Sequence, residues 1–430
     1  MLRFTGRRVL STYVGSSPRR AGLKSSCAHT LTIVKCFVTP VMKSLNIGCV
    51  CPRSHLGHRY GGSVLPFRIE VPQPAIDDLR ARLSSTRWPD DVTGAAPDWS
   101  WGTPPGVLRM VAAYWRNEYD WTAAQARWNG FAQYLVPTDE GNIHVVRAGT
   151  PGRTPLMLVH GWPDGFPRFE KAIPLLADRF DLVIPSIPGF GFSDRPRHPG
   201  AGPSRIADRF AAVMSALGID QFAVHGADLG STVAEALAAR HPDRVTALHL
   251  GDVPAWHRYT VDPATTSPAE RAFLDGMASW FADEGAYAAL QRTKPQTLAF
   301  ALNDSPVGLA SWIVEKLRAW SDCSGDVFSR FSPGEIVDWV SLYWFTQTAG
   351  SAARHYREGA LERRDDARRP SAPTGLTLFS HDIACPPREY AERFFDVRHF
   401  AVVAQGGHFG PWEEPELWAA DLTAFLDSAL

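Results

Sequence analysis

Short apolar runs alternate with helical patterns along most of the chain, and this alternation limits the folds that it can adopt. The runs begin at residues 142, 155, 181, 222, 245, 375 and 400. Helical patterns lie between several of them, as over 205–218, and one covers the C-terminus over 415–430. Apolar strands that alternate with helices predict a mostly parallel sheet with helices on both faces. We therefore expect an α/β fold with its ligand at the carboxyl ends of the strands.

The run FAVHGADLGS, residues 222–231, predicts a strand, a sharp turn and a helix. Gly226 and Gly230 flank Asp228 at two positions on either side, which is the spacing of the nucleophile elbow G-x-S-x-G in the α/β-hydrolase fold. The central residue is aspartate where that motif has serine. An aspartate in a glycine-flanked turn is more often a turn former or a helix N-cap than a nucleophile, so its interpretation depends on the other motifs.

Two further motifs follow apolar strands in the order typical of that fold. HGWP, residues 160–163, comes after PLMLV, where the fold places a loop whose backbone N–H contributes to the oxyanion hole. GGHF, residues 406–409, comes after FAVVA and before the last helix, which is the place of the catalytic histidine. His408 is therefore the expected base, whereas His160 and His225 are expected to structure their turns.

An acid is expected between the nucleophile and the histidine, where it orients the imidazole through the Nδ1–H. Asp382 follows the strand GLTLF, and Asp252 ends the strand VTALHL. We favour Asp382 because it ends the strand nearest in sequence to the His408 loop, as in the usual order of the triad. Asp252 stays open as the alternative.

The chain divides into four parts by its patterns. Residues 67–140 predict a helical N-terminal segment, and residues 141–252 and 371–430 form the expected α/β core. Between them, residues 253–370 read as helices rich in Trp and Phe, which predicts an inserted cap that closes an apolar pocket over the strand ends. The aromatic residues of the cap suggest either a pocket rim for a bulky apolar substrate or simply cap core: Trp312, Trp339, Trp344 and Phe345.

Residues 1–66 differ in composition from everything that follows. The first acidic residue is Glu70, Arg and Lys recur before it, and four of the six cysteines lie there. This composition fits a transit peptide, a membrane anchor, or sequence translated upstream of the true start. Lys35 and Lys43 interrupt the apolar runs well short of a bilayer span, which argues against the anchor. We favour an upstream extension, with Met42 as one candidate start.

The net charge and the cysteines limit the partners, the compartment and the metal sites that can be expected. A formal net charge of −1 gives no reason to expect nucleic acid or an anionic membrane as a partner, and no membrane span is predicted. Cys323 and Cys385 are isolated in the body of the chain, which indicates a reducing compartment, so we expect a cytoplasmic protein. The cysteines show no metal-site spacing, and neither a metal nor a cofactor is expected. Assembly into a homo-oligomer is left open.

From about Phe67 to its C-terminus, the chain resembles the epoxide hydrolases of the microsomal and juvenile hormone type. The resemblance rests on the N-terminal helical segment, HGWP, G-x-D-x-G-S, the cap segment KPQTLAFALNDSPVGLASWIVEK, and GGHF followed by EEPEL. It implies an α/β-hydrolase fold with Asp228 as nucleophile, His408 as base and Asp382 as acid. One departure is Leu229, where many relatives have Trp, but its implied role needs only the backbone N–H.

The same resemblance implies two cap tyrosines that hydrogen-bond the epoxide oxygen. By motif context these are Tyr287 in EGAYAALQRTKP and Tyr356 in ARHYREG. Without the resemblance, a cap tyrosine is most often a core or rim residue. Tyr259 and Tyr343 also lie in the cap, and we expect them to pack.

An aspartate nucleophile suits this chemistry. Serine attack on an epoxide carbon would leave an ether, which activated water does not readily cleave, whereas aspartate leaves an ester. Water activated by His408 can attack the carbonyl carbon of Asp228 itself, while the N–H groups of Trp162 and Leu229 stabilise the oxyanion. The implied reaction converts an apolar epoxide, a small-molecule substrate, to a vicinal diol.

Three rival functions fit the sequence less well than an epoxide hydrolase. A haloalkane dehalogenase also uses an aspartate elbow, but it typically binds halide with a Trp after the nucleophile, and Leu229 has no indole N–H. A non-catalytic binding protein of this fold would be expected to lack the nucleophile, the base or the oxyanion loop. An esterase is the weakest alternative because it needs serine at position 228.

Overall fold

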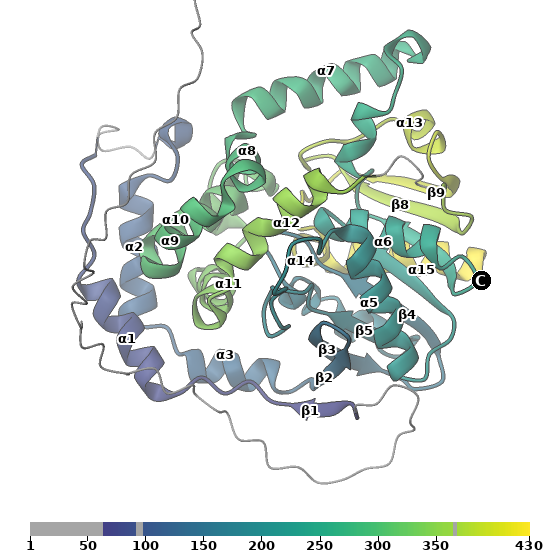
Figure 1. Cartoon of the computed structure of the whole chain (residues 1–430). Coiled ribbons are helices and arrows are strands. Elements are labelled where there is room, and N and C mark those ends of the chain that lie inside the picture. The colour runs from purple at the N-terminus through teal and green to yellow at the C-terminus, as the bar shows by residue number, and fades with distance from the viewer. Residues whose placement is uncertain (1–62, 92–97, 364–367) are drawn as a thin grey trace, which may run out of the picture. The chain divides into compact units, whose positions relative to one another are not determined.

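The computed structural model describes residues 63–91, 98–363 and 368–430 (Figure 1). The predicted leader up to residue 62, with Met42, lies outside the described residues. The strands are β1 (Leu65–Phe67), β2 (Ala132–Thr138), β3 (Gly141–Gly149), β4 (Thr154–Val159), β5 (Phe180–Pro185), β6 (Phe222–Gly226), β7 (Val245–Leu250), β8 (Pro373–Phe379) and β9 (Asp396–Val403).

Helices make up most of the remaining described chain. The α-helices are α1 (Gln73–Ser84), α2 (Pro105–Asn117), α3 (Trp121–Trp128), α4 (Ile173–Leu176), α5 (Pro203–Ala216), α6 (Leu229–Arg240), α7 (Pro268–Asp283), α8 (Ala286–Thr293), α9 (Pro295–Asp304), α10 (Pro306–Trp320), α11 (Pro333–Thr346), α12 (Ala349–Leu361), α13 (Arg388–Glu392), α14 (Gly410–Glu413) and α15 (Pro415–Ala429). Single 3₁₀ turns are η1 (Trp99–Trp101), η2 (Phe166–Phe169), η3 (Ala255–Tyr259), η4 (Pro263–Thr265) and η5 (Val327–Ser329).

The strands form one sheet in the order β1-β2-β3-β5-β4-β6-β7-β8-β9. From β5 to β9 all neighbours are parallel, whereas β1, β2 and β3 are antiparallel to their neighbours. Every residue of β5 and β6 is buried, because helices such as α5, α6 and α15 cover the sheet (Figure 1). The predicted α/β fold with a mostly parallel sheet is confirmed.

The segment before the core contains two strands that the sequence did not predict. Helix α1 buries Ile76, Leu79 and Leu83 on one face, as its apolar spacing predicts. Strand β1 pairs with β2, and β2 pairs with β3, so this segment extends the sheet at its antiparallel edge. Both strands were missed because β1 has only three residues and β2 directly follows a strong helical pattern.

Six helices, α7 to α12, lie in chain order between β7 and β8 and form the cap (Figure 1). Local sequence explains where they begin: Ser332 and Glu335 form a capping box at α11, and Ser305 caps α10 by accepting from the backbone N–H of Gly308. Both α10 and α11 have proline at their first position, where no intrahelical N–H is needed. The domain boundaries proposed from the sequence stay a prediction.

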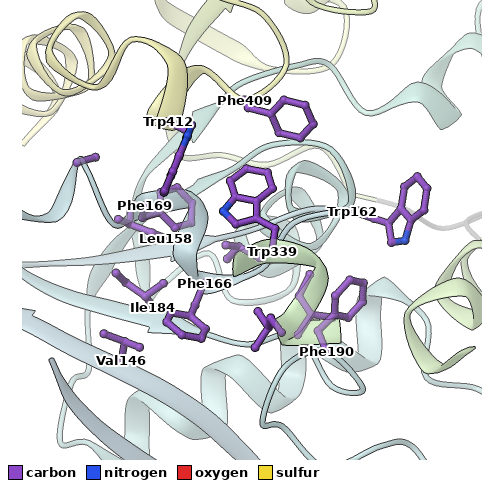
Figure 2. Close-up of a cluster of buried hydrophobic side chains, with 14 of the residues drawn as sticks. Val146, Leu158, Trp162, Phe166, Phe169, Ile184, Phe190, Trp339, Phe409 and Trp412 are labelled. Carbon is purple, nitrogen blue, oxygen red and sulfur yellow. The ribbon is translucent and has the colours of Figure 1, made fainter. Parts of the chain in front are cut away.

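The aromatic residues expected at a pocket rim pack elsewhere. Trp339 lies edge-on to Phe409 and Trp412, with ring centroids 5.4 and 5.3 Å apart (Figure 2). Phe345 packs on Trp121 of α3. None of the four cap residues Trp312, Trp339, Trp344 and Phe345 lines the cavity that Asp228 and His408 share. The interpretation as a pocket rim was therefore wrong, and the alternative, cap core, describes Trp339.

Candidate active site

The turn between β6 and α6 holds Asp228 in a strained backbone conformation. Its φ of 56° and ψ of −125° lie where residues with a side chain are rarely found. The flanking glycines are required by close backbone packing. A Cβ on Gly226 would lie 2.1 Å from the carbonyl oxygen of Gly230, and one on Gly230 would lie 2.4 Å from that of Val159. The G-x-D-x-G spacing is thus a steric requirement of this elbow.

The HGWP loop supplies a donor to the Asp228 carboxylate. The backbone N–H of Trp162 donates to Asp228 Oδ1 at 2.8 Å, and the backbone N–H of Leu229 also stabilises the ionised carboxylate. Asp164 holds the loop by accepting from the Gly161 N–H at 2.8 Å. Both predicted oxyanion-hole residues therefore direct their N–H groups toward the carboxyl group of Asp228.

His408 lies between two carboxylates. Its Nδ1 is 2.8 Å from Asp382 Oδ1, and its Nε2 is 3.7 Å from Asp228 Oδ2 and has no hydrogen-bond partner among the described residues. The imidazole is 5% exposed. Arg168 fixes the loop by donating to the His408 carbonyl oxygen, and the backbone N–H of His408 donates to the carbonyl oxygen of Trp320. The order of groups is that of a nucleophile, a base and an orienting acid.

The two candidate acids have different partners. Asp382 Oδ1 accepts from His408, whereas Asp252 makes no hydrogen bond or ion pair with that imidazole and instead contacts the elbow. Asp252 Oδ2 accepts from the backbone N–H of Asp228, and its Oδ1 lies 2.6 Å from Ser231 Oγ. Asp252 therefore braces the turn that carries Asp228, a contact that no sequence pattern indicated.

Burial and neighbouring charges set the protonation of these groups. Burial raises the pKa of Asp228, and the charge of His408 and the N–H groups of Leu229 and Trp162 offset part of that rise. Burial raises the pKa of Asp252 to about 7. Burial lowers the pKa of His408, but the adjacent Asp382, and then Asp228, outweigh it and raise this pKa to about 9. At neutral pH the imidazole is thus a cation between two carboxylates.

Two tyrosines from separate cap helices lie over the HGWP loop. Tyr287 of α8 stacks on the ring of Trp162, with centroids 5.1 Å apart and an interplanar angle of 8°. Tyr356 of α12 lies edge-on to Tyr287 at 5.8 Å, and its buried hydroxyl has no partner among the described residues. Burial raises the pKa of both tyrosines. The charge of Asp228 adds to the rise for Tyr287, and the neighbouring Tyr287 adds to the rise for Tyr356. Both hydroxyls are therefore protonated donors at neutral pH.

The other tyrosines and histidines considered have structural contacts. Tyr343 is buried and donates to the carbonyl oxygen of Asp164 at 2.8 Å, as expected for a packing residue. Tyr259, expected to pack, is 68% exposed at the mouth of the cavity. His160 accepts from the Ile187 N–H at 3.0 Å and so holds two loops together. His225 lies in β6, hydrogen-bonded to His249 at 2.9 Å, and so does not structure a turn.

A cavity of about 520 Å³ joins these groups. Asp228, His408, Asp382, Tyr287 and Tyr356 all line it, together with Asp252 and Leu229. Its apolar wall comes largely from α7, through Phe273, Met277, Trp280 and Phe281. The sequence analysis missed these four, although their spacing at i, i+4, i+7 and i+8 marks one face of a helix.

The described residues contain no group of three or more His, Cys, Asp or Glu side chains arranged to hold a metal ion. In the same part of the chain, no helix has both the length and the apolar character needed to cross a bilayer. Cys323 is buried and Cys385 is exposed, and neither forms a disulfide.

Comparisons with known proteins agree with this arrangement. The family model described as epoxide hydrolase N terminus matches residues 64–169, and the alpha/beta hydrolase fold model matches residues 154–415. A Stigmatella aurantiaca protein assigned to the epoxide hydrolases is 37% identical over 84% of this chain and 84% of its own length. Epoxide hydrolase 1 of Sus scrofa is 31% identical over 85% of this chain and 88% of its own.

Solved structures show the same fold. The juvenile hormone epoxide hydrolase of the silkworm Bombyx mori superposes with a TM-score of 0.77, at 26% identity, over 85% of this chain and 95% of its own. The epoxide hydrolase of Aspergillus niger superposes with a TM-score of 0.76, at 28% identity, over 86% of this chain and 97% of its own.

Proposed function

Because the chain belongs to the epoxide hydrolase family of the α/β-hydrolase fold, we propose that it converts an apolar epoxide to a vicinal diol through an ester on Asp228. The observation that carries the proposal is that the Trp162 N–H and His408 Nε2 both face the carboxylate of Asp228. Trp162 N–H holds Asp228 Oδ1 at 2.8 Å, and the unpartnered His408 Nε2 lies 3.7 Å from Oδ2. A nucleophile, an oxyanion donor and a base thus meet at one carbon atom.

In the first step, a carboxylate oxygen of Asp228 attacks an epoxide carbon and the ring C–O bond breaks. The negative charge moves to the ring oxygen, which takes a proton from Tyr287 or Tyr356. The raised pKa values of both phenols support this role, because the hydroxyls stay protonated until an alkoxide, a much stronger base, forms beside them. The product of this step is an ester between Asp228 and the substrate.

Ester formation also prepares the base. In the free enzyme Asp228 is one of two carboxylates that raise the pKa of His408 to about 9. Esterification removes that charge, so the pKa of His408 falls and its proton can leave, restoring the tyrosine. The base therefore becomes neutral only after the ester exists. Asp382 continues to hold Nδ1 and so leaves Nε2 free to accept a proton from water.

In the second step, water deprotonated by His408 attacks the carbonyl carbon of Asp228. The resulting oxyanion is stabilised by the N–H groups of Trp162 and Leu229. The bond to the diol oxygen then breaks and the diol takes the proton from His408. The hydroxyl proton left on Asp228 passes to His408, so Asp228 regains its carboxylate with one oxygen from water and His408 becomes a cation again. Halide release from a haloalkane is not expected, because Leu229 provides no indole N–H.

A single turnover with excess enzyme in heavy-oxygen water tests this mechanism. We expect the label in the peptide that carries Asp228, because the ester is cleaved at the carbonyl carbon of the enzyme. Asp228→Ala should form no diol, and His408→Gln should accumulate the ester. Label in the diol alone would mean direct attack of water on the epoxide and would overturn the proposal. A parallel panel of haloalkanes, assayed for halide, tests the rival function.

We place the protein in the cytoplasm, with support from the two unpaired cysteines Cys323 and Cys385, and subcellular fractionation would test this location. A homo-oligomer stays a proposal that light scattering on the purified protein can decide.

A further inference from the structure

One polar atom on the cavity wall has no role in the proposed reaction. Among the described residues that line the cavity, three have a buried polar atom without a hydrogen-bond partner: Tyr356 Oη, His408 Nε2 and Arg258 Nη1. The mechanism accounts for the first two, which exchange protons with the epoxide and with water. Buried polar groups in native proteins are nearly always satisfied. The orphaned donor of Arg258 therefore points to a partner that comes with the substrate.

Arg258 is held rigidly at the end of η3, directly after β7. Its guanidinium lies over the ring of Phe281 on α7, 3.7 Å from the centroid, and over that of Tyr259 at 4.5 Å. One nitrogen donates to the Tyr259 hydroxyl. These contacts orient the planar group but leave its charge without a carboxylate, since no described residue forms an ion pair with it.

Among the described residues, two other buried cations are paired with carboxylates, whereas the buried Arg209 donates to Thr138 Oγ1 and to backbone carbonyl oxygens. Arg168 is paired with Asp164, and Lys316 Nζ lies 2.6 Å from Glu315. Arg292 of α8 is the second arginine on the cavity wall, and it too has no ion pair with any described residue, although it is exposed to water. An arginine is always charged, so two unpaired guanidinium groups at one cavity form a positive site.

The chemistry around this site selects the ligand. Guanidinium binds carboxylate through two parallel hydrogen bonds, and α7 provides the apolar residues Phe273, Met277 and Trp280 on the same wall. We infer that the cavity takes epoxides that carry a carboxylate on an apolar chain, with Arg258 binding the carboxylate and Arg292 adding positive charge at the exposed side.

The acidic residues of the cavity make such a site necessary for an anionic substrate. Asp228 and Asp382 both line it, and the single charge of His408 offsets only one of them, so an anion without a further cation would be repelled. The charge of Arg258 also acts on the pKa of Tyr287, where it counters the rise due to burial. The guanidinium is thus within electrostatic range of the reacting end of the cavity. The inference rests on the proposed function, because it names the substrate class of the same site.

The test compares an epoxy fatty acid with its methyl ester, which has the same chain and epoxide but no charge. The measured quantity is the ratio of kcat/KM for the acid to that for the ester. Because both substrates are assayed in the same variant, the ratio corrects for any general loss of activity. We expect the ratio to fall about ten- to a hundredfold in Arg258→Met, as for the loss of one charge-assisted hydrogen bond. Arg258→Lys should retain part of the wild-type preference for the acid.

Arg116→Gln is the matched control, because Arg116 lies on the surface of α2 and, among the described residues, its side chain hydrogen-bonds only to the adjacent Asn117. It should leave both the ratio and the activity unchanged. A ratio that is the same in the wild type, Arg258→Met and Arg258→Lys would overturn the inference, and Arg258 would then only fasten η3 to α7. A wild-type enzyme that prefers the methyl ester would overturn it as well.

A binding measurement separates this inference from the proposed function. Stearate has the chain and the carboxylate but no epoxide, so its binding needs no catalysis. Calorimetry should show binding to the wild type and at least about tenfold weaker binding to Arg258→Met. If stearate binds in this way but neither styrene oxide nor the epoxy acid is hydrolysed, the proposed function fails and the carboxylate site stands. If styrene oxide is hydrolysed but stearate does not bind, only the inference fails.

Discussion

Asp252 and Asp382 are alike in sequence context, because each follows an apolar strand of the core, but their hydrogen bonds differ. Ser231 Oγ lies 2.6 Å from both Asp252 Oδ1 and the Asp228 carbonyl oxygen, yet the hydroxyl has one proton to donate. A protonated Asp252 resolves this by donating to Ser231. The pKa of Asp252, raised to about 7 by burial, is consistent with this assignment.

Asn replacements at the two acids should therefore have different effects. Asp382→Asn leaves the His408 imidazolium without its carboxylate, so we expect a normal burst of ester followed by slow hydrolysis. Asp252→Asn keeps one acceptor for the Asp228 N–H and one donor for Ser231, and should be nearly silent. Rapid quench with mass spectrometry of the intact protein measures both steps.

Asp252→Ala is the informative contrast at the same position. It leaves the Asp228 N–H buried without an acceptor and should destabilise the elbow by about 1–3 kcal/mol. We expect a lower melting temperature and a slowing of both steps. Ester that accumulates in the Asp252 variants but not in Asp382→Asn would move the role of the acid to Asp252. Wild-type turnover in both Asn variants and in the double variant would remove the triad.

At the scale of elements, the two cap tyrosines act together because α8 and α12 pack side by side. Neither helix alone provides both hydroxyls, and the stacking of Tyr287 on Trp162 joins α8 to the loop that carries an oxyanion donor. The cap therefore contributes donors to the site as well as covering it. Its position relative to the HGWP loop determines where the ring oxygen must lie.

Tyr287→Phe and Tyr356→Phe should each slow ring opening by about ten- to a thousandfold, because each removes a proton donor to the leaving oxygen. Hydrolysis of the ester does not use these protons and should change little. Single-turnover kinetics resolves the two rates. Tyr134→Phe, on β2 and away from the cavity, is the control. Slower ester hydrolysis with unchanged ester formation would contradict the assignment.

At the scale of the whole molecule, buried neutral histidines connect the strands of the sheet. His225 of β6 bonds to His249 of β7, which lies 2.9 Å from Thr377 of β8. Burial lowers the pKa of His249 to about 3, and it does the same for His144 of β3. Both imidazoles are therefore neutral in the folded protein over most of the pH range.

Because the pKa of His249 is lower in the folded protein than in the unfolded chain, the free energy of unfolding depends on pH. In the unfolded chain a histidine binds a proton below pH of about 6.5, whereas folded His249 stays neutral down to about 3. Its contribution is complete above about 6.5 and is lost as the pH falls toward 3. Between pH 7.5 and 5 the expected loss is about 2 kcal/mol for this residue. Urea unfolding of the wild type and of His249→Gln at both pH values measures it.

The difference between the wild type and His249→Gln in how much stability each loses on acidification isolates the contribution of His249. Asp252 acts in the opposite direction, because its pKa is raised to about 7 and its contribution weakens as the pH rises. That effect is common to both proteins and cancels in the comparison. We expect His249→Gln to lose less stability on acidification than the wild type. An equal loss in both would show that His249 is not buried and neutral.

The features predicted from the sequence are those that depend on local chemistry and on chain order. The elbow around Asp228 is readable because only glycine fits at the flanking positions of that turn. His408 and Asp382 are readable because the loops that follow successive parallel strands meet at one edge of the sheet. The mostly parallel sheet follows from apolar runs that are buried on both faces.

The features that required the tertiary structure depend on which surfaces pack together. The aromatic residues of several cap helices are alike in sequence, but only the packed cap shows that α7 lines the cavity while Trp339 packs in the core. Strand β1 needs β2 as a partner, and its three residues carry no signal alone. The bracing of the elbow by Asp252 and the unpaired charge of Arg258 are likewise properties of neighbours distant in sequence, because hydrogen bonding and burial arise only once the chain has folded.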